Sequence, residues 1–232
     1  MKLSVIIPAF NEKGTIKEIV KKVSAAPFEK EIIVVDDGST DGTADVLKEL
    51  EVPATIIFHE ANTGKGASIK SALKKVTGDI VIIQDADLEY DPQEFGKLIE
   101  PILNGETEVV YGSRNLKTDA GGRHANPISS SSFYLGGIFL SKLANFLYGT
   151  QITDESTGYK VFKTEVIKNI DLKCRGFAFC AEVTAKLCRK GYRIKEVPIS
   201  YRPRGFKQGK KIHWYDGLIA VITLLKYRFS GS

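Results

Sequence analysis

The first half of the chain alternates short, continuously apolar segments with segments in which apolar residues recur every three or four positions. Short continuous apolar segments are typical of buried strands, and they occur at residues 4–9, 31–35, 54–58, 80–83 and 108–111. The intervening segments have the period of amphipathic helices. Strands that alternate with helices form a mostly parallel sheet with right-handed crossovers. We therefore predict an α/β fold in which helices flank a mostly parallel central sheet.

The second half of the chain contains two strongly apolar segments. Residues 115–131 are polar and rich in Gly and Ser, and a loop of this length inside a domain is usually functional or disordered. Apolar helices are predicted at residues 133–147 and from Trp214 onward, and a basic loop at 202–211 precedes the second. Since no repeat or low-complexity linker divides the chain, we expect residues 1–232 to form a single domain.

Composition narrows the class of protein. Hydrophobic residues make up 43% of the chain, which is enough for a sizeable core. The net charge of +5 supports an anionic partner only weakly, and no nucleic-acid motif stands out, so we expect no nucleic-acid partner. The cysteines form no close CxxC pair, which favours reduced thiols in a cytoplasmic protein. The longest late apolar segment, residues 218–225, is far shorter than the ~20 residues of a membrane span.

Polar side chains follow the predicted strands at the points where those strands end. They are Asn11-Glu12, Asp36-Asp37, Asp85 to Asp87, and Ser113-Arg114. The carboxyl ends of parallel strands meet at one edge of a sheet, and ligands of α/β proteins bind there. We therefore predict a binding site at this edge.

Asp85 and Asp87 are candidates for a metal site. Alternate residues of an extended segment point the same way, so the two carboxylates repel each other unless a cation lies between them. Mg²⁺ or Mn²⁺ takes such oxygens and keeps positions open for substrate phosphates. A diphosphate leaving group needs such a cation, because charge builds on its oxygen as the bond breaks. The alternative is a pair of turn or helix-capping aspartates.

Two further segments indicate ligand contacts. Asp37 can accept a hydrogen bond from a base or a ribose hydroxyl, while residues 39–41 cap the following helix. The segment 62–66, Asn-Thr-Gly-Lys-Gly, resembles a phosphate cradle but lacks the P-loop spacing. We interpret it as a tight turn whose Lys65 reaches a base or a phosphate.

Four ordered motifs resemble the family 2 glycosyltransferases, and most closely their dolichyl- or polyprenyl-phosphate mannosyl- and glucosyltransferase branch. They are Val5–Glu12, Val34–Thr43, Asp85–Leu88 and Gly112–Arg114, and Thr157–Phe162 fits the same pattern. The resemblance covers about residues 3–212. It implies a GT-A fold, a nucleotide-sugar donor, a divalent metal (Mg²⁺ or Mn²⁺) and inversion at the anomeric carbon. Residues 1–114 would then be the nucleotide-sugar-binding half and residues 115–232 the acceptor-side half.

The resemblance also implies roles for individual residues. Asp85, Asp87 and Arg114 would be catalytic, with Arg114 facing the donor or acceptor phosphate. The metal would be held by Asp85, Asp87 and Glu89, where the branch often has glutamine at the last position. The donor-binding residues would be Pro8, Phe10, Asn11, Glu12, Asp37, Lys65, Asp85 and Ala86.

The acceptor side departs from the branch. The branch usually carries an arginine and a serine four residues apart in the helix after the long loop. Phe133 and Gly137 stand at those positions in this chain, and Arg123 is the nearest basic residue. We predict that cations bind an acceptor phosphate: Arg123, Arg202, Arg204, Lys210 and Lys211. Because like charges cannot pack together unpaired, the loop 202–211 is expected to be mobile without ligand. The two apolar helices could lie in the membrane plane or pack in the core.

Three functions remain open from the sequence. The first is hexose transfer from GDP-mannose or UDP-glucose to a polyprenyl or dolichyl phosphate, at the cytoplasmic face of a membrane. The second is transfer to a hydroxyl acceptor, which needs a base, and Glu182 occupies the region where hydroxyl-acceptor relatives place one. The third is a non-catalytic, sugar-nucleotide-binding subunit of a glycosylation complex, with a membrane protein as its partner.

Overall fold

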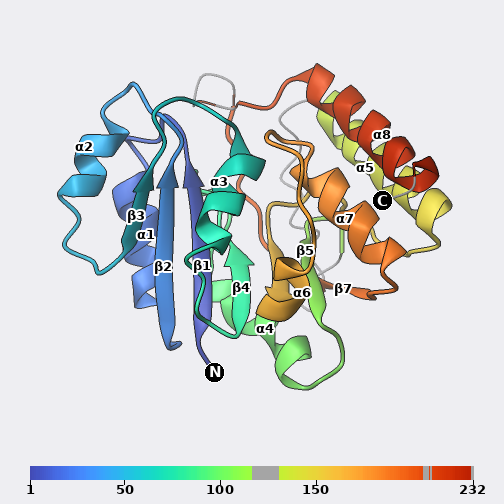
Figure 1. The fold of residues 1–232 in the computed structure, drawn as a ribbon, viewed down its shortest axis with the longest axis horizontal. Coiled ribbons are helices and arrows are strands. Elements are labelled where there is room, and N and C mark those ends of the chain that lie inside the picture. Colours follow the sequence, from blue (N-terminus) through green and yellow to red (C-terminus); the bar gives the residue numbers. More distant parts are fainter. Residues whose placement is uncertain (117–130, 206–208, 210, 231–232) are drawn as a thin grey trace.

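The protein is built on one sheet. The computed structural model describes residues 1–116, 131–205, 209 and 211–230. Within them the strands follow the order β3-β2-β1-β4-β6-β5-β7 (Figure 1). These strands are β1 Leu3–Ala9, β2 Lys30–Asp36, β3 Thr55–Phe58, β4 Ile80–Ile83, β5 Val109–Ser113, β6 Lys160–Lys163 and β7 Ile194–Pro198. All neighbours pair in parallel except β6, which is antiparallel to β4 and β5. The predicted mostly parallel sheet is confirmed.

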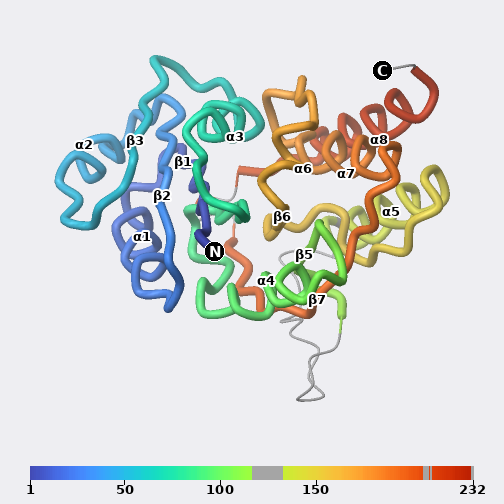
Figure 2. The backbone as a smooth tube through the Cα atoms, turned by 60° about the horizontal axis from the view of Figure 1, so that its bottom comes forward, coloured from blue at the N-terminus to red at the C-terminus, as the bar shows by residue number. Residues whose placement is uncertain are grey.

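Helices cover both faces of this sheet (Figure 2). They are α1 Ile16–Ala25, α2 Thr43–Lys48, α3 Lys65–Leu73, α4 Phe95–Leu103 after a 3-10 turn at Pro92–Glu94, α5 Ser131–Tyr148, α6 Thr164–Lys168, α7 Phe179–Arg189 and α8 Trp214–Phe229. Alternate strand residues face opposite sides, so Val5 and Ile7 pack with α1 and α4, and Ile6 packs with α3, α6 and α7. Two buried cores therefore enclose the strands and hold their carboxyl ends in fixed positions.

The antiparallel strand β6 changes what reaches the carboxyl edge of the sheet. Ile82 of β4 lies opposite Val161 of β6, in a register that runs in the reverse direction. A strand with this direction begins where its neighbours end. The segment 153–159, which leads into β6, therefore lies beside the residues that follow β4 and β5.

Helices α5, α7 and α8 form a third cluster at one end of the molecule. Leu140 and Ala144 of α5 pack there with Ala220 and Leu224 of α8. Helices α5 and α8 also expose apolar side chains, including Phe146 of α5, which is 86% exposed. On α8 the exposed residues follow a helical stripe: Trp214, Leu218, Ile222, Leu225 and Phe229. In the part of the chain that the structure describes, no helix combines the length and apolar character needed to span a bilayer.

Candidate active site

The polar residues predicted at the strand ends meet at the carboxyl edge of the sheet. Asp85 and Asp87 follow β4, and each carboxylate contacts a cation of the protein. The ammonium group of Lys65, at the start of α3, lies 2.5 Å from Asp85 Oδ1. The guanidinium of Arg204, far along the chain, lies 3.3 Å from Asp87 Oδ2. This edge therefore combines anionic and cationic groups from distant segments.

Two non-glycine residues in the turns at this edge adopt a left-handed backbone conformation. Asn11 has a φ of 50° and Leu88 a φ of 62°. Asparagine tolerates the left-handed region, but for leucine such a conformation costs about 1–3 kcal/mol. Leu88 directly follows Asp87, whose Oδ1 accepts the backbone N–H of Glu89 at 3.1 Å. The strain therefore lies in the turn that aims the carboxylate of Asp87.

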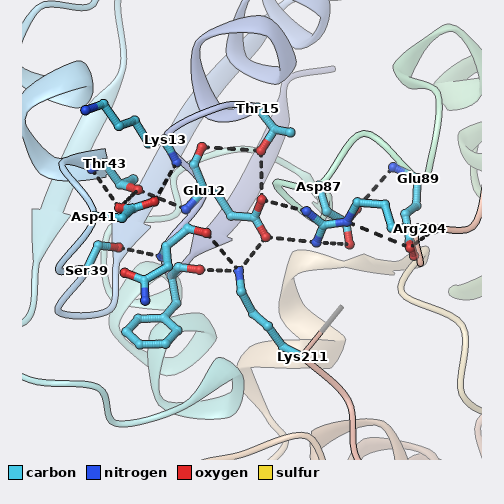
Figure 3. Close-up of polar contacts among 12 residues, drawn as sticks. Glu12, Lys13, Thr15, Ser39, Asp41, Thr43, Asp87, Glu89, Arg204 and Lys211 are labelled. Atoms are coloured by element: carbon cyan, nitrogen blue, oxygen red, sulfur yellow. Dashed lines mark hydrogen bonds and ion pairs between the residues drawn. The ribbon is translucent and has the colours of Figure 1, made fainter. Parts of the chain in front are cut away.

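Glu12 is the anchor of the C-terminal basic loop. Its carboxylate accepts two hydrogen bonds of 2.9 Å from Arg204 and contacts Lys211 Nζ at 2.5 Å (Figure 3). Burial alone would raise the pKa of this carboxyl, but the hydrogen bonds from Arg204 and Lys211 outweigh that effect and lower the pKa. Glu12 is thus ionised and paired, in a position that the resemblance gives to the donor pocket.

Asp87 stands among like charges. Burial, followed by the charges of Asp85 and Glu89, raises the pKa of Asp87 to about 7, although Arg204 acts in the opposite direction. Carboxylates crowded in this way fit a divalent cation, which would remove their repulsion. Mg²⁺ is typically held by one or two carboxylates together with waters and substrate phosphates. The described residues contain no complete cage of three or more ligands for a metal, and Asp85 with Asp87 fits the partial site.

Glu89 is held mainly by the protein. Its carboxylate accepts the backbone N–H of Arg204 at 2.7 Å and the hydroxyl of Tyr201 at 2.8 Å. These contacts tie the loop after β7 to the turn after β4. The metal role of Glu89 stays a prediction, and these contacts give the residue a second role as the support of Arg204.

Asp37 has its carboxylate turned toward the chain itself. It accepts the backbone N–H groups of Thr63, at 3.1 Å, and of Gly64, at 2.6 Å, and lies 2.7 Å from His59 Nδ1. These hydrogen bonds lower the pKa of Asp37 against the opposing effect of burial. Asp37 therefore fixes the segment that precedes Lys65, and its role in binding a base stays a prediction.

Arg114 is paired with a residue that the sequence analysis did not select. Its Nε and one terminal nitrogen each donate to Asp154 at 2.7 Å, and its guanidinium lies 4.9 Å from the centre of the Tyr201 ring. Asp154 is only 1% exposed. The antiparallel entry into β6 brings Asp154 here, and no sequence periodicity indicates that pairing.

Gly158 is a second residue that the sequence analysis did not assign. A Cβ atom at this position would lie 2.2 Å from Asp85 Oδ2. The N–H of Gly158 donates to Tyr90 Oη at 3.0 Å. The segment before β6 thus packs directly against the Asp85 carboxylate, and only glycine permits that approach.

The remaining donor-side residues lie along the same edge. Phe10 C=O accepts a hydrogen bond from Lys211, and Asn11 Oδ1 accepts the N–H of Thr40 at 2.8 Å. Pro8 is half-buried and Ala86 is buried. The donor-binding role of these four residues stays a prediction.

The predicted acceptor residues divide into groups. Arg202 is exposed, whereas Arg204 and Lys211 are paired with Glu12. The expectation of a mobile loop assumed that its charges have no partners in the protein. Arg204 and Lys211 do have partners, because carboxylates that follow β1 and β4 contact them. Arg123 and Lys210 lie outside the described residues.

Glu182 occupies a different environment from that expected of a base. Its side chain, on α7, is fully buried, and its carboxylate accepts from Lys173 N, Cys174 N, Lys186 Nζ and Tyr227 Oη. Burial would raise the pKa of Glu182, but these hydrogen bonds lower it. A buried, saturated and weakly basic carboxylate is poorly suited to proton abstraction from an acceptor, and the catalytic role of Glu182 stays a prediction.

Comparison with known proteins identifies the family and the fold of this chain. The profile of Glycosyl transferase family 2 matches residues 4–171. Solved structures of glucosyl-3-phosphoglycerate synthase from Mycobacterium tuberculosis share the fold: the UDP complex has a TM-score of 0.74 at 20% identity and covers 100% of this chain and 81% of the other. The fold is thus GT-A, and the chain belongs to glycosyltransferase family 2.

Several curated proteins are similar to most of this chain. The chain is 31% identical to the dolichol-phosphate mannosyltransferase of Pyrococcus furiosus, over 98% of this chain and 64% of that protein. It is also 31% identical to the hexosyltransferase Agl6 of Haloferax volcanii, over 87% of this chain but only 48% of the relative. A UDP-N-acetylglucosamine–dolichyl-phosphate N-acetylglucosaminyltransferase of Methanococcus voltae is 31% identical, over 84% of this chain and 83% of the relative. The chain thus spans about half to two thirds of the length of the first two.

Proposed function

We propose that this chain is an inverting glycosyltransferase that moves a hexose from a nucleotide diphosphate sugar to a polyprenyl or dolichyl phosphate. The observation that carries the proposal is the meeting of Asp85 and Asp87 with Lys65 and Arg204 at one sheet edge. Carboxylates suit a divalent cation, and the cations beside them suit phosphate oxygens. The names of the polyprenyl-phosphate transferases among the relatives support the choice of acceptor.

In the proposed reaction the bond between the anomeric carbon and the diphosphate oxygen breaks. An oxygen of the acceptor phosphate attacks the opposite face of that carbon, so the configuration inverts and the nucleoside diphosphate leaves. Mg²⁺ or Mn²⁺, held by Asp85 and Asp87, would neutralise the charge that develops on the diphosphate. Lys65 and Arg204 would bind phosphate oxygens from either side of the same edge, and Arg114 would serve the donor or acceptor phosphate.

The acceptor phosphate is already anionic near neutral pH, so its attack requires no general base. This matches the burial of Glu182, whose carboxylate is saturated by the protein. It also weakens the alternative of a hydroxyl acceptor, which depends on a base. GDP-mannose and UDP-glucose are the proposed donors, and the Methanococcus voltae relative adds UDP-N-acetylglucosamine as a third to test.

We further propose that the enzyme works at the cytoplasmic face of a membrane through peripheral contact. Its exposed stripe on α8 begins with Trp214, which is 74% exposed, and ends with Phe229, which is 78% exposed. Aromatic side chains favour the interface between lipid and water. A membrane-protein partner remains part of this proposal.

The test is a product assay with the three nucleotide sugars, Mn²⁺ or Mg²⁺, and two matched acceptors, a short polyprenyl phosphate and the corresponding polyprenol. We expect transfer to the phosphate and none to the alcohol. Product from the polyprenol alone would establish a hydroxyl-acceptor enzyme. Donor binding by calorimetry without turnover of any acceptor would establish a non-catalytic subunit.

A further inference from the structure

The buried carboxylate of Glu182 controls the shape of a neighbouring loop. Its Oε1 accepts the backbone N–H of Lys173 at 2.8 Å, and its Oε2 accepts that of Cys174 at 2.6 Å. A carboxylate is the one side-chain group that offers an acceptor oxygen to each of two N–H groups without presenting a donor. Glu182 therefore determines the path of residues 173–176, although it lies on the following helix, α7.

This loop packs against the beginning of α3 with backbone on backbone. The carbonyl of Arg175 accepts the N–H of Ala67 at 3.0 Å. A Cβ atom on Gly64 would lie 2.4 Å from that carbonyl oxygen, and one on Gly66 would lie 2.6 Å from the carbonyl oxygen of Cys174. No side chain separates the two segments, so a displacement of the loop is transmitted to the first turn of α3.

Lys65 lies between these two glycines. Its side chain is 15% exposed, and its ammonium group is 2.5 Å from Asp85 Oδ1. On the other side of the segment, Asp37 accepts the N–H of Gly64 at 2.6 Å. The first turn of α3 is thus held between two buried carboxylates, directly by Asp37 and through the loop 173–176 by Glu182.

Helix α8 joins the same network. The hydroxyl of Tyr227 donates to Glu182 Oε1 at 2.7 Å, and Lys186 Nζ lies 2.6 Å from the same oxygen. A second tyrosine provides a comparison, since Tyr148 of α5 donates to the carbonyl of Leu224 on α8 at 2.6 Å. The hydroxyl of Tyr148 contacts α8 from outside, and that of Tyr227 belongs to α8 itself. Of these two hydroxyls, that of Tyr227 is the one that donates to Glu182.

We propose that Glu182 is a positioning residue for the donor site, which acts through the loop 173–176 and the first turn of α3 to hold Lys65 against Asp85. The inference rests on the proposed function, because Asp85 and Lys65 are assigned there to the metal and the donor diphosphate. In this role Glu182 holds the loop 173–176 in place and transfers no proton. Tyr227 shares that role, since it supports the Glu182 carboxylate from α8.

The test compares Glu182→Gln and Tyr227→Phe with Tyr148→Phe as the matched control. In Glu182→Gln the amide can accept only one of the two backbone N–H groups and opposes the other, so we expect the KM for the donor to rise about tenfold or more, the effect of a lost charge-assisted hydrogen bond. Tyr227→Phe should raise the KM in the same direction by less. In both variants amide exchange at Ala67 should accelerate. Tyr148→Phe should change neither quantity.

A double variant separates this role from a general loss of stability. Once Lys65→Met has removed the ammonium group, adding Glu182→Gln should raise the donor KM little further, whereas a merely structural effect would add in full. If Glu182→Gln loses kcat while its donor KM is unchanged, Glu182 acts as a general base and the inference is overturned. So would unchanged donor KM in both Glu182→Gln and Tyr227→Phe. If the wild-type chain binds no sugar nucleotide, the proposed function itself fails, while faster exchange at Ala67 would still report the loop contact.

Discussion

Arg204 and Glu12 are 192 positions apart in the chain, and they meet through two hydrogen bonds of 2.9 Å each. The same guanidinium donates to the carboxylate of Asp87, and the backbone N–H of Arg204 donates to the carboxylate of Glu89. One side chain therefore ties the loop after β7 to the ends of β1 and β4. The position of this loop over the carboxyl edge of the sheet depends on that residue.

Replacing Arg204 with methionine removes this connection while keeping much of the side-chain volume. Glu12, which is 7% exposed, would keep only Lys211 and Thr15 as polar side-chain partners within the described residues. We expect the free energy of unfolding to fall by about 1.5–3 kcal/mol, the range for hydrogen bonds to charged groups. Urea unfolding measures it. Arg202→Met is the control at an exposed position and should change stability by less than about 0.5 kcal/mol. Equal effects of the two variants would contradict the anchoring role.

Asp87→Asn should abolish turnover and preserve the fold. Burial, together with the charges of Asp85 and Glu89, raises the pKa of Asp87 and disfavours its ionised form. In EDTA the neutral amide should therefore leave thermal stability unchanged or raise it. Turnover of the wild type should cease in EDTA and return with Mn²⁺ or Mg²⁺. A product assay and a melting curve together measure both effects. Full activity in EDTA would refute the metal role.

Asp37→Ala tests the donor pocket. The loss of a charge-assisted hydrogen bond to the base should raise the donor's dissociation constant about tenfold or more. Since Asp37 also holds Thr63 and Gly64, the variant should unfold more readily. His59→Gln perturbs the same segment without removing the carboxylate and serves as the comparison. Calorimetry with an unchanged affinity for Asp37→Ala would reject Asp37 as a donor residue.

The apolar stripe on α8 should bind lipid. Ile222 and Phe229 are 63% and 78% exposed, so replacing both with glutamine should cost the fold little. Burial of each such side chain is worth about 1.5–3 kcal/mol, and binding to anionic vesicles should therefore weaken by at least about tenfold in sedimentation assays. Leu103→Gln, on α4 and 49% exposed, is the matched control and should bind as the wild type does. If the double variant bound vesicles as tightly as the wild type, α8 would have no role in membrane binding.

Glu31 gives an acid-sensitive contribution to stability. Burial opposes ionisation, but hydrogen bonds from Ser4, Thr77 and Lys2 prevail and lower its pKa to about 2. A carboxyl whose pKa is depressed on folding stabilises the protein above its unfolded pKa, near 4.5, and that contribution is lost as the pH falls toward 2. Glu31→Gln should therefore destabilise the protein at pH 7 and progressively less below pH 4.5. Unfolding curves across this range measure the difference, and a pH-independent difference would contradict the assignment.

The sequence alone determined the α/β layers, the mostly parallel sheet and the location of the Asp85 and Asp87 pair. These follow from local patterns, because apolar periodicity specifies strands and helices, and strand ends are marked by the polar residues that follow them. Helix boundaries were close as well, with the predicted helix at 133–147 falling inside Ser131–Tyr148.

Only the tertiary structure decided which side chains meet. The antiparallel direction of β6 brings Asp154 to Arg114 and Gly158 to Asp85, and no local pattern encodes the direction of a strand inserted between two others. The same holds for Arg204 with Glu12 and for Glu182 with the loop 173–176. A charged residue has the same local pattern whether its partner is a ligand or another part of the chain. Long-range packing makes that choice, because it determines which buried charges are neutralised by the protein and which remain for a substrate.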